Sequence, residues 1–173
     1  MSDAINIIPL VATLVFFYAA WSDFQRWRIP NGAILALITI YALGAIVRLT
    51  TTQDIGATLF SLDGIGGEVG AGLLLFTLGV ALWAFRLFGA GDAKLFLPIG
   101  LFVGWHGMLP FAVFLLIGGI LTMVALRLPV PLAFAHYAVA MRIEEIRTSR
   151  KIPYGVIMVF GTLVTMALRH RQT

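Results

Sequence analysis

Long apolar runs, separated by short polar stretches, dominate the pattern along the chain. None of these runs shows the alternation typical of strands, and most are long enough to cross about 30 Å of hydrocarbon. The segment 93–103 is too short to cross alone, and Gly104–Gly107 separates it from the next run. The pattern predicts an all-α integral membrane protein, a six-transmembrane-helix bundle whose fourth helix is short or broken. The expected helices cover about residues 4–21 and beyond, 33–49, 68–88, 93–103, 108–126 and 152–168.

Composition supports a membrane protein. The 173 residues are 60% hydrophobic and only 12% charged, with a mean hydropathy of +0.98, more apolar than a soluble domain of this size can hide. The first run is not expected to be a removed signal, because Asp3 replaces the basic start and no small-residue cleavage site follows. Without an internal repeat or a low-complexity linker, residues 1–173 are expected to form a single membrane-embedded domain.

Glycine, proline and polar residues mark the expected connections. Pro30 sets the latest end of the first helix, and Asn31 and Gly32 form a turn signal. Residues 50–67 are predicted to be a polar loop, and residues 129–151 an amphipathic segment on the membrane surface. Small residues allow close helix packing, which is the expected role of the glycines before and within the third run, namely Gly66, Gly67, Gly70, Gly72 and Gly79.

Basic residues predict the orientation, since Lys and Arg favour the cytoplasmic side. With the N-terminus outside, only Arg48, Arg169 and Arg171 fall on the outer side. The cytoplasmic side then receives Arg26, Arg28, Arg86, Lys94, Arg127, Arg142, Arg147, Arg150 and Lys151. This orientation places Asp23, at the end of the first helix, and Asp92, at the start of the fourth, on the same cytoplasmic face.

Asp23 and Asp92 are the candidate functional residues, because acids near spanning segments are costly. Gly89 and Gly91 precede Asp92 and are expected to allow a tight turn or a close approach of the backbone. Two structural alternatives stay open. Asp92 is also a good helix N-cap, and Asp23 could pair with Arg26 three residues later on a solvated helix end.

Two carboxyl groups that approach closely cannot both ionise cheaply, so one keeps a proton near neutral pH. The ionised group can take a proton from water while the other polarises a peptide carbonyl, as in aspartic proteases. Other chemistries find less support. The chain has no cysteine, no HExxH zinc motif and no GxSxG elbow. No metal and no cofactor are therefore expected, and the histidines His106, His136 and His170 are expected to be structural or interfacial.

Three motifs resemble those of the type IV prepilin peptidase family, the GxGD-class intramembrane aspartic proteases. The first is DFQRWRIPN at 23–31, the second is GAGDAKL at 89–95, and the third is KIPYG at 151–155. They occur in the order typical of the family and span most of the chain. The stretch at 26–31 favours the prepilin branch over presenilin-type relatives.

The resemblance implies that Asp23 and Asp92 form the catalytic pair. It implies cleavage of the short basic leader of prepilins, after a glycine, at the cytoplasmic face of the cytoplasmic (inner) membrane. Without paired cysteines and a cytoplasmic segment after the first helix, N-methylation is not expected. The chain is more similar to the short peptidases of Flp (tight-adherence) pilus systems than to archaeal preflagellin peptidases. The implied supporting residues are Arg28, Pro30, Asn31, Gly89, Gly91, Lys94, Pro153 and Gly155.

A non-catalytic transporter or assembly subunit, with Asp23 and Asp92 as an ion or proton relay, is the alternative. The expected partners are a prepilin with a basic leader and an apolar helix, and membrane lipid. Nucleic acid is not expected, because the net charge of +4 comes from residues that flank apolar runs. Glu144 and Glu145 are candidate contacts for the leader, although pairing of Glu144 with Arg147 explains them as well.

Overall fold

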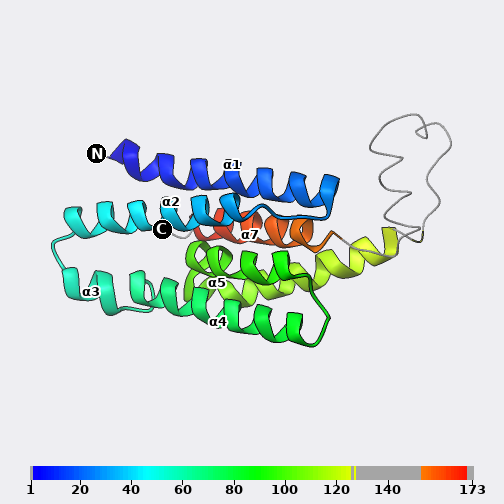
Figure 1. Ribbon diagram of the computed structural model, residues 1–173. Coiled ribbons are helices and arrows are strands. Elements are labelled where there is room, and N and C mark those ends of the chain that lie inside the picture. The colour runs from blue at the N-terminus through cyan, green and yellow to red at the C-terminus, as the bar shows by residue number, and fades with distance from the viewer. Residues whose placement is uncertain (1, 126, 128–152, 171–173) are drawn as a thin grey trace.

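The computed structural model describes residues 2–125, 127 and 153–170, and nothing but helices and their connections occurs among them. This confirms the all-helical prediction. The sequence interpretation of 129–151, including Glu144 and Glu145, and His136 lie outside the described residues. The helices are α1 (Ser2–Arg26), α2 (Asn31–Thr51), α3 (Ile55–Phe60), α4 (Ile65–Ala84), α5 (Ala90–Ala125) and α7 (Tyr154–His170) (Figure 1).

Four stretches in the described part of the chain are long and apolar enough to cross a membrane: Ile7–Arg26, Asn31–Thr51, Ile55–Ala84 and Ala90–Ala125. The protein is therefore a membrane protein, and α7 is a shorter apolar helix. The count of six spanning helices is not confirmed. Within α5, however, Gly104 has φ 71° and ψ 178°, which no helix residue adopts. Gly104 lies where the sequence predicts a break, so the part of α5 before it, residues 90–103, is short.

The prediction of a polar loop over 50–67 is wrong. The short helix α3 lies inside this stretch, and α4 begins at Ile65. Asp54 explains the first of these helices, because its Oδ1 accepts a hydrogen bond of 2.9 Å from the amide of Ala57 and so caps the N-terminus of α3. Polar residues that cap a short helix resemble loop residues in a sequence pattern.

The arrangement of the helices brings distant segments together at one end of the bundle. The C-terminus of α1 lies at the same end as the N-termini of α5 and α7 (Figure 1). The C-terminus of α2, the N-terminus of α4 and the C-terminus of α7 lie toward the opposite end. Helix α7 packs against both α1 and α5, so it lies between the two elements that carry the candidate aspartates.

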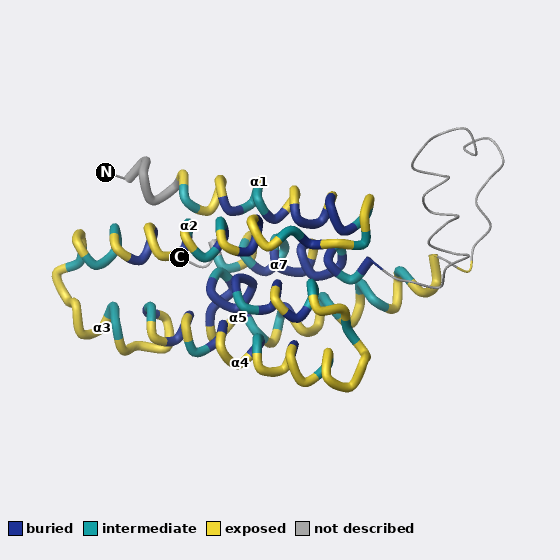
Figure 2. Tube along the Cα trace, viewed as in Figure 1, coloured by how far each residue is buried: buried dark blue, intermediate teal, exposed yellow. Residues whose placement is uncertain are grey.

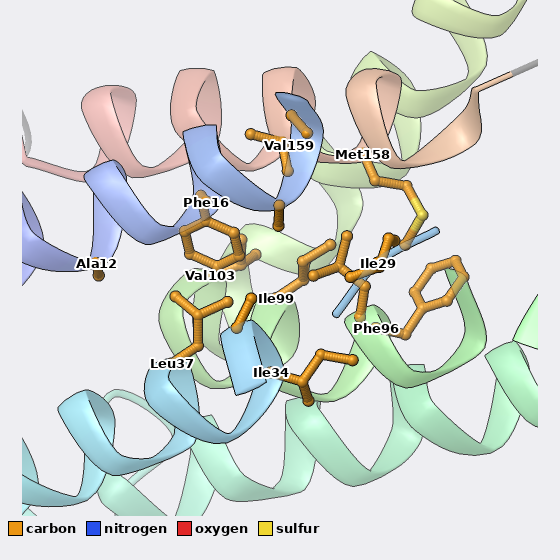
Figure 3. Packing of buried hydrophobic residues seen from close by; sticks show 14 of the residues in the cluster. Ala12, Phe16, Ile29, Ile34, Leu37, Phe96, Ile99, Val103, Met158 and Val159 are labelled. Carbon is orange, nitrogen blue, oxygen red and sulfur yellow. The ribbon is translucent and has the colours of Figure 1, made fainter. Parts of the chain in front are cut away.

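The buried core joins α1, α2, α5 and α7 (Figure 3). Phe16, Leu37, Ile99 and Met158 are fully buried in it. Most of the outward-facing positions of the helices are exposed (Figure 2), and large apolar side chains such as Leu116 are among them. An apolar outer surface around a packed interior is the distribution expected of helices that face lipid.

Glycines set the contact between α4 and α5. A methyl group on Gly100 would lie 2.5 Å from the Cα of Gly72, so the two backbones touch. Gly79 also lies close to α5, since a Cβ there would lie 2.7 Å from the ring of Phe96 and 3.0 Å from the carbonyl oxygen of Ala93. The packing role predicted for Gly72 and Gly79 is confirmed. A Cβ on Gly66 would lie 2.4 Å from the carbonyl oxygen of Leu59 in α3, so this glycine allows a close approach of α3 and α4.

Gly100→Ala should destabilise the protein by about 1–3 kcal/mol, the usual cost of an overpacked interior. Gly119→Ala is the matched control, because no atom outside its own helix lies within 4 Å of the added methyl group. Thermal unfolding of both variants in detergent tests this contact. An unfolding temperature of Gly100→Ala equal to that of wild type would contradict the close approach of α4 and α5.

Candidate functional site

Asp23 lies in the last turn of α1, and its side chain points into the protein. The residue is only 6% exposed. Its Oδ2 accepts a hydrogen bond of 3.0 Å from the amide of Gly155, in the first turn of α7. Asp23 is buried whereas Arg26 is exposed, so the carboxyl group of Asp23 does not lie on a solvated helix end. The N-terminus of a helix is instead directed at it, an arrangement that suits a negative charge.

Asp92 lies in the first turn of α5 and is half-buried. Its Oδ2 accepts a hydrogen bond of 3.1 Å from the amide of Gly89. The capping alternative is thus partly realised, although Asp92 acts from the third helical position and not as the N-cap itself. Asp92 is also close enough to Asp23 for their charges to interact. One residue therefore both caps its helix and lies within electrostatic range of the second carboxyl group.

Contacts between motifs hold the two aspartates at one end of the bundle. Ile29 is buried, and its Cβ would lie 3.5 Å from a methyl group on Gly91. The Nζ of Lys94 donates a hydrogen bond of 3.2 Å to the Oδ1 of Asn31. The stretch that follows Asp23 therefore packs against the residues on both sides of Asp92.

Aromatic contacts add the third motif to this site. The ring of Phe88, in the connection before α5, lies 4.7 Å from the ring of Tyr154 and 5.9 Å from that of Phe96, centroid to centroid. Pro153 is buried immediately before α7. The connection between α4 and α5 thus packs on the start of α7, beside the amide that binds Asp23.

The expected role of the glycines before Asp92 needs a correction. Gly104 is the glycine with a positive φ in the described part of the chain, so Gly89 and Gly91 adopt no left-handed conformation. A methyl group on Gly91 would make only ordinary contact with Ile29. Gly155 is the more restricted position, because a methyl group there would lie 2.8 Å from the Oδ2 of Asp23. The left-handed residue in the connection before α5 is Arg86, with φ 61°, so Gly89 and Gly91 are not there for a positive φ.

A left-handed residue, unforeseen from the sequence, ends α1. Trp27 has φ 55°, which few residues other than glycine and asparagine adopt. Its amide donates to the carbonyl of Asp23 at 2.9 Å, and the hydroxyl of Ser22 donates to the carbonyl of Arg28 at 2.9 Å. These bonds fix the path of the chain from Asp23 to Pro30, while the side chain of Arg28 stays exposed.

The remaining polar candidates form no second catalytic arrangement among the described residues. His106 pairs with Asp63 through Nδ1 and Oδ1 at 2.9 Å, and both side chains are exposed. No group of three or more His, Cys, Asp or Glu residues that could hold a metal occurs in the described ranges. The side chain of His170 lies outside what the structure describes.

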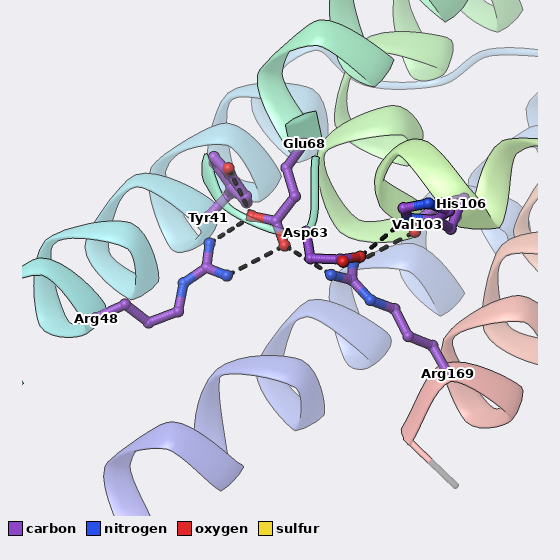
Figure 4. Close-up of polar contacts among 7 residues, drawn as sticks. All are labelled: Tyr41, Arg48, Asp63, Glu68, Val103, His106 and Arg169. Carbon is purple, nitrogen blue, oxygen red and sulfur yellow. Dashed lines mark hydrogen bonds and ion pairs between the residues drawn. The ribbon is translucent and has the colours of Figure 1, made fainter. Parts of the chain in front are cut away.

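Glu68 forms a polar cluster that sequence reasoning missed (Figure 4). Its side chain is buried and pairs with Arg48 of α2 and Arg169 of α7, while Tyr41 donates to its Oε2 at 2.8 Å. The available signal was a lone acid at the start of an apolar run, with two of the three arginines predicted on the same side. This cluster lies toward the end of the bundle opposite the candidate aspartates.

The fold and the site define an all-helical membrane protein in which two acidic side chains, from segments nearly seventy residues apart, lie at one end of the bundle, close enough for their charges to interact. The chain belongs to the type IV leader peptidase family, whose model matches residues 10–128. That match includes Asp23 and Asp92 and stops before the motif at 151–155. No curated protein and no solved structure gives a match. The resemblance found from the three motifs is therefore confirmed, and the protein is a peptidase.

Proposed function

We propose that this protein is an intramembrane aspartic endopeptidase that removes the short basic leader of type IV prepilins, or of prepilin-like proteins, with Asp23 and Asp92 as its catalytic pair. The observation that carries the proposal is the convergence of the two carboxyl groups with the first turn of α7. The family match supports peptidase activity. The short distance between Asp23 and Gly155 supports a defined position for one carboxyl group.

In the proposed reaction, the two carboxyl groups share one proton. The ionised group takes a proton from water, and the resulting hydroxide attacks the carbonyl carbon of the scissile peptide. The protonated group donates its proton to the carbonyl oxygen. As the C–N bond breaks, the group that took the proton from water passes it to the leaving nitrogen, and the other group takes its proton back. A buried carboxyl group next to a half-buried one suits a pair in which one group is ionised and the other protonated, because neither is fully hydrated.

The proposed substrate has a basic leader, a glycine before the cleaved bond and an apolar helix after it. Its helix would lie in the bilayer while the leader stays in the cytoplasm, so the cleaved bond lies at the depth of Asp23 and Asp92. An Flp-type pilus system fits a short chain without paired cysteines. For the same reason we propose peptidase activity without N-methylation. Glu144 and Glu145 remain proposed contacts for the leader.

The relay alternative requires two acids that exchange a proton or an ion, but no peptide substrate. No contact in the described structure favours it over the peptidase. Cleavage of a co-expressed prepilin separates the two functions. We expect a product that lacks the leader and starts directly after the glycine, identified by mass spectrometry. Uncleaved prepilin in cells that contain well-expressed protein would reject the peptidase for that substrate class.

The proposed orientation, with the N-terminus outside the cytoplasmic membrane, has its own test. Gln25, near the end of α1, and Gln53, just after α2, are both exposed. They lie at opposite ends of the helix bundle. Each can be changed to cysteine in a chain that has none. A thiol reagent that does not cross membranes should label Gln53→Cys in intact cells and leave Gln25→Cys unlabelled until the cells are opened. The reverse pattern would place the aspartates outside.

A further inference from the structure

A second site lies toward the end of the bundle opposite the two aspartates. A cavity of about 930 Å³ opens between α1, α2, α5 and α7, lined by apolar side chains and, at one end, by the cluster around Glu68. We propose that this cavity binds one acyl chain of an anionic phospholipid, with the lipid phosphate at Arg48 and Arg169. Neither the family match nor the proposed peptidase reaction assigns a function to it.

The charged end of the cavity suits an anion. Glu68 is buried and accepts hydrogen bonds from Arg48 and Arg169, at 3.1 Å from the Nη1 of Arg48 and 3.2 Å from the Nη2 of Arg169. Two guanidinium groups and one carboxylate leave a net charge of +1. Each guanidinium group carries five N–H donors, and about a third of each arginine side chain remains exposed. Donors are therefore left for a phosphate, a group that arginine binds well.

Contacts on the protein side hold the two arginines in place without a ligand. The Nη1 of Arg169 also donates to the carbonyl of Val103 at 3.4 Å, next to the break at Gly104. The guanidinium group of Arg48 lies 6.0 Å from the ring centre of Tyr41. An arginine pair that is already positioned loses little side-chain entropy when it binds a phosphate.

The apolar part of the cavity suits a lipid chain. Phe17 of α1, Leu101 of α5 and Leu163 of α7 are among the residues that line it, and Phe17 is exposed on an outer face of the bundle. A helix with its side chains is about 10 Å across, so the cavity could hold only roughly two turns of one. The spanning helix of a substrate is therefore a poorer fit than an acyl chain. Cavities of this size are typical of small-ligand sites.

Two substitutions on α7 separate binding in the cavity from general adsorption of lipid. Ala167 is exposed and lines the cavity, so Ala167→Trp should fill it. Leu168 is also exposed but is not among the lining residues, and Leu168→Trp is the matched control. Arg169→Gln removes one of the two proposed phosphate contacts and leaves Arg48 paired with Glu68.

The experiment measures the unfolding temperature of the purified full-length protein during titration with phosphatidylglycerol, phosphatidylcholine or inorganic phosphate. Phosphatidylglycerol should stabilise wild type and Leu168→Trp at lower concentrations than phosphatidylcholine does. Inorganic phosphate should have no effect. Ala167→Trp should lose this response, and Arg169→Gln should need about fivefold more phosphatidylglycerol, since each Arg near an anionic lipid contributes on the order of that factor.

Equal responses to the two phospholipids in wild type would overturn the proposal, and so would an unchanged response in Ala167→Trp. A raised KM for a prepilin in Ala167→Trp, with the lipid response intact, would assign the cavity to the substrate helix instead. The unfolding temperature of each variant without lipid reports whether the fold itself is damaged.

Discussion

Asp23→Asn and Asp92→Asn should each abolish leader cleavage, with losses of at least about 10²–10⁴-fold in kcat, the usual contribution of one acid–base group. The amide keeps the size of the side chain but can neither accept a proton from water nor donate one as an acid. In a pair that shares one proton, neither carboxyl group can replace the other. The measurement is the rate of product formation from a purified prepilin in detergent or liposomes.

Asp63→Asn is the control for this pair. Asp63 is an exposed acid that pairs with His106, and it belongs to neither of the motifs around Asp23 and Asp92. It should keep near-wild-type activity. Unfolding temperatures and membrane levels comparable with wild type are required of all three variants. If Asp23→Asn or Asp92→Asn cleaves at a normal rate, the proposed pair is wrong.

Gly155→Ala should lose about 10²-fold in kcat/KM, whereas Gly91→Ala should stay within a few-fold of wild type. The added methyl group at position 155 would lie 2.8 Å from the Oδ2 and 3.0 Å from the Cγ of Asp23, so the carboxyl group or the start of α7 must move. A displacement of about 1 Å at reacting groups costs a factor of that size. At Gly91 the nearest atom, the Cβ of Ile29, is 3.5 Å away and needs no movement.

The two glycine variants are compared by steady-state kinetics on the same prepilin, with the unfolding temperature of each as a check on folding. The contrast matters because both glycines belong to motifs of the family pattern. Equal activity in both variants would show that the contact between Asp23 and the first turn of α7 does not position the carboxyl group. A large loss of activity in Gly91→Ala alone would show that the turn before α5, and not the start of α7, positions the catalytic carboxyl groups.

Much of this arrangement could be predicted from the sequence, because a membrane restricts what a chain can do. Apolar runs in a bilayer must be helices or closed barrels, so run length alone indicated where the helices lie. The break at Gly104 was predicted because the run from residue 95 was too long for one ordinary crossing. The distribution of basic residues predicted that Asp23 and Asp92 lie at the same membrane end, and the described bundle places them together.

The remaining features depend on contacts that no sequence pattern records. The role of Gly155 follows from its contact with Asp23, 132 residues earlier in the sequence, and a single glycine gives no sign of that contact. The left-handed Trp27 is unexpected because propensity favours glycine or asparagine there. Glu68 resembled the first residue of a helix, a common place for an acid, whereas its pairing with Arg48 and Arg169 required three helices to meet.

The central claim is that Asp23 and Asp92 meet in one site, and chemical cross-linking tests it most directly. Cysteines at both positions, in a chain without other cysteines, should be joined by a short bifunctional thiol reagent in the membrane-embedded protein. Asp63→Cys with His106→Cys is the positive control, because those side chains lie 2.9 Å apart. Asp23→Cys with Asp63→Cys is the negative control. We expect an internal cross-link between positions 23 and 92, identified by mass spectrometry after digestion; its absence, while the positive control is joined, would contradict the proposed pair.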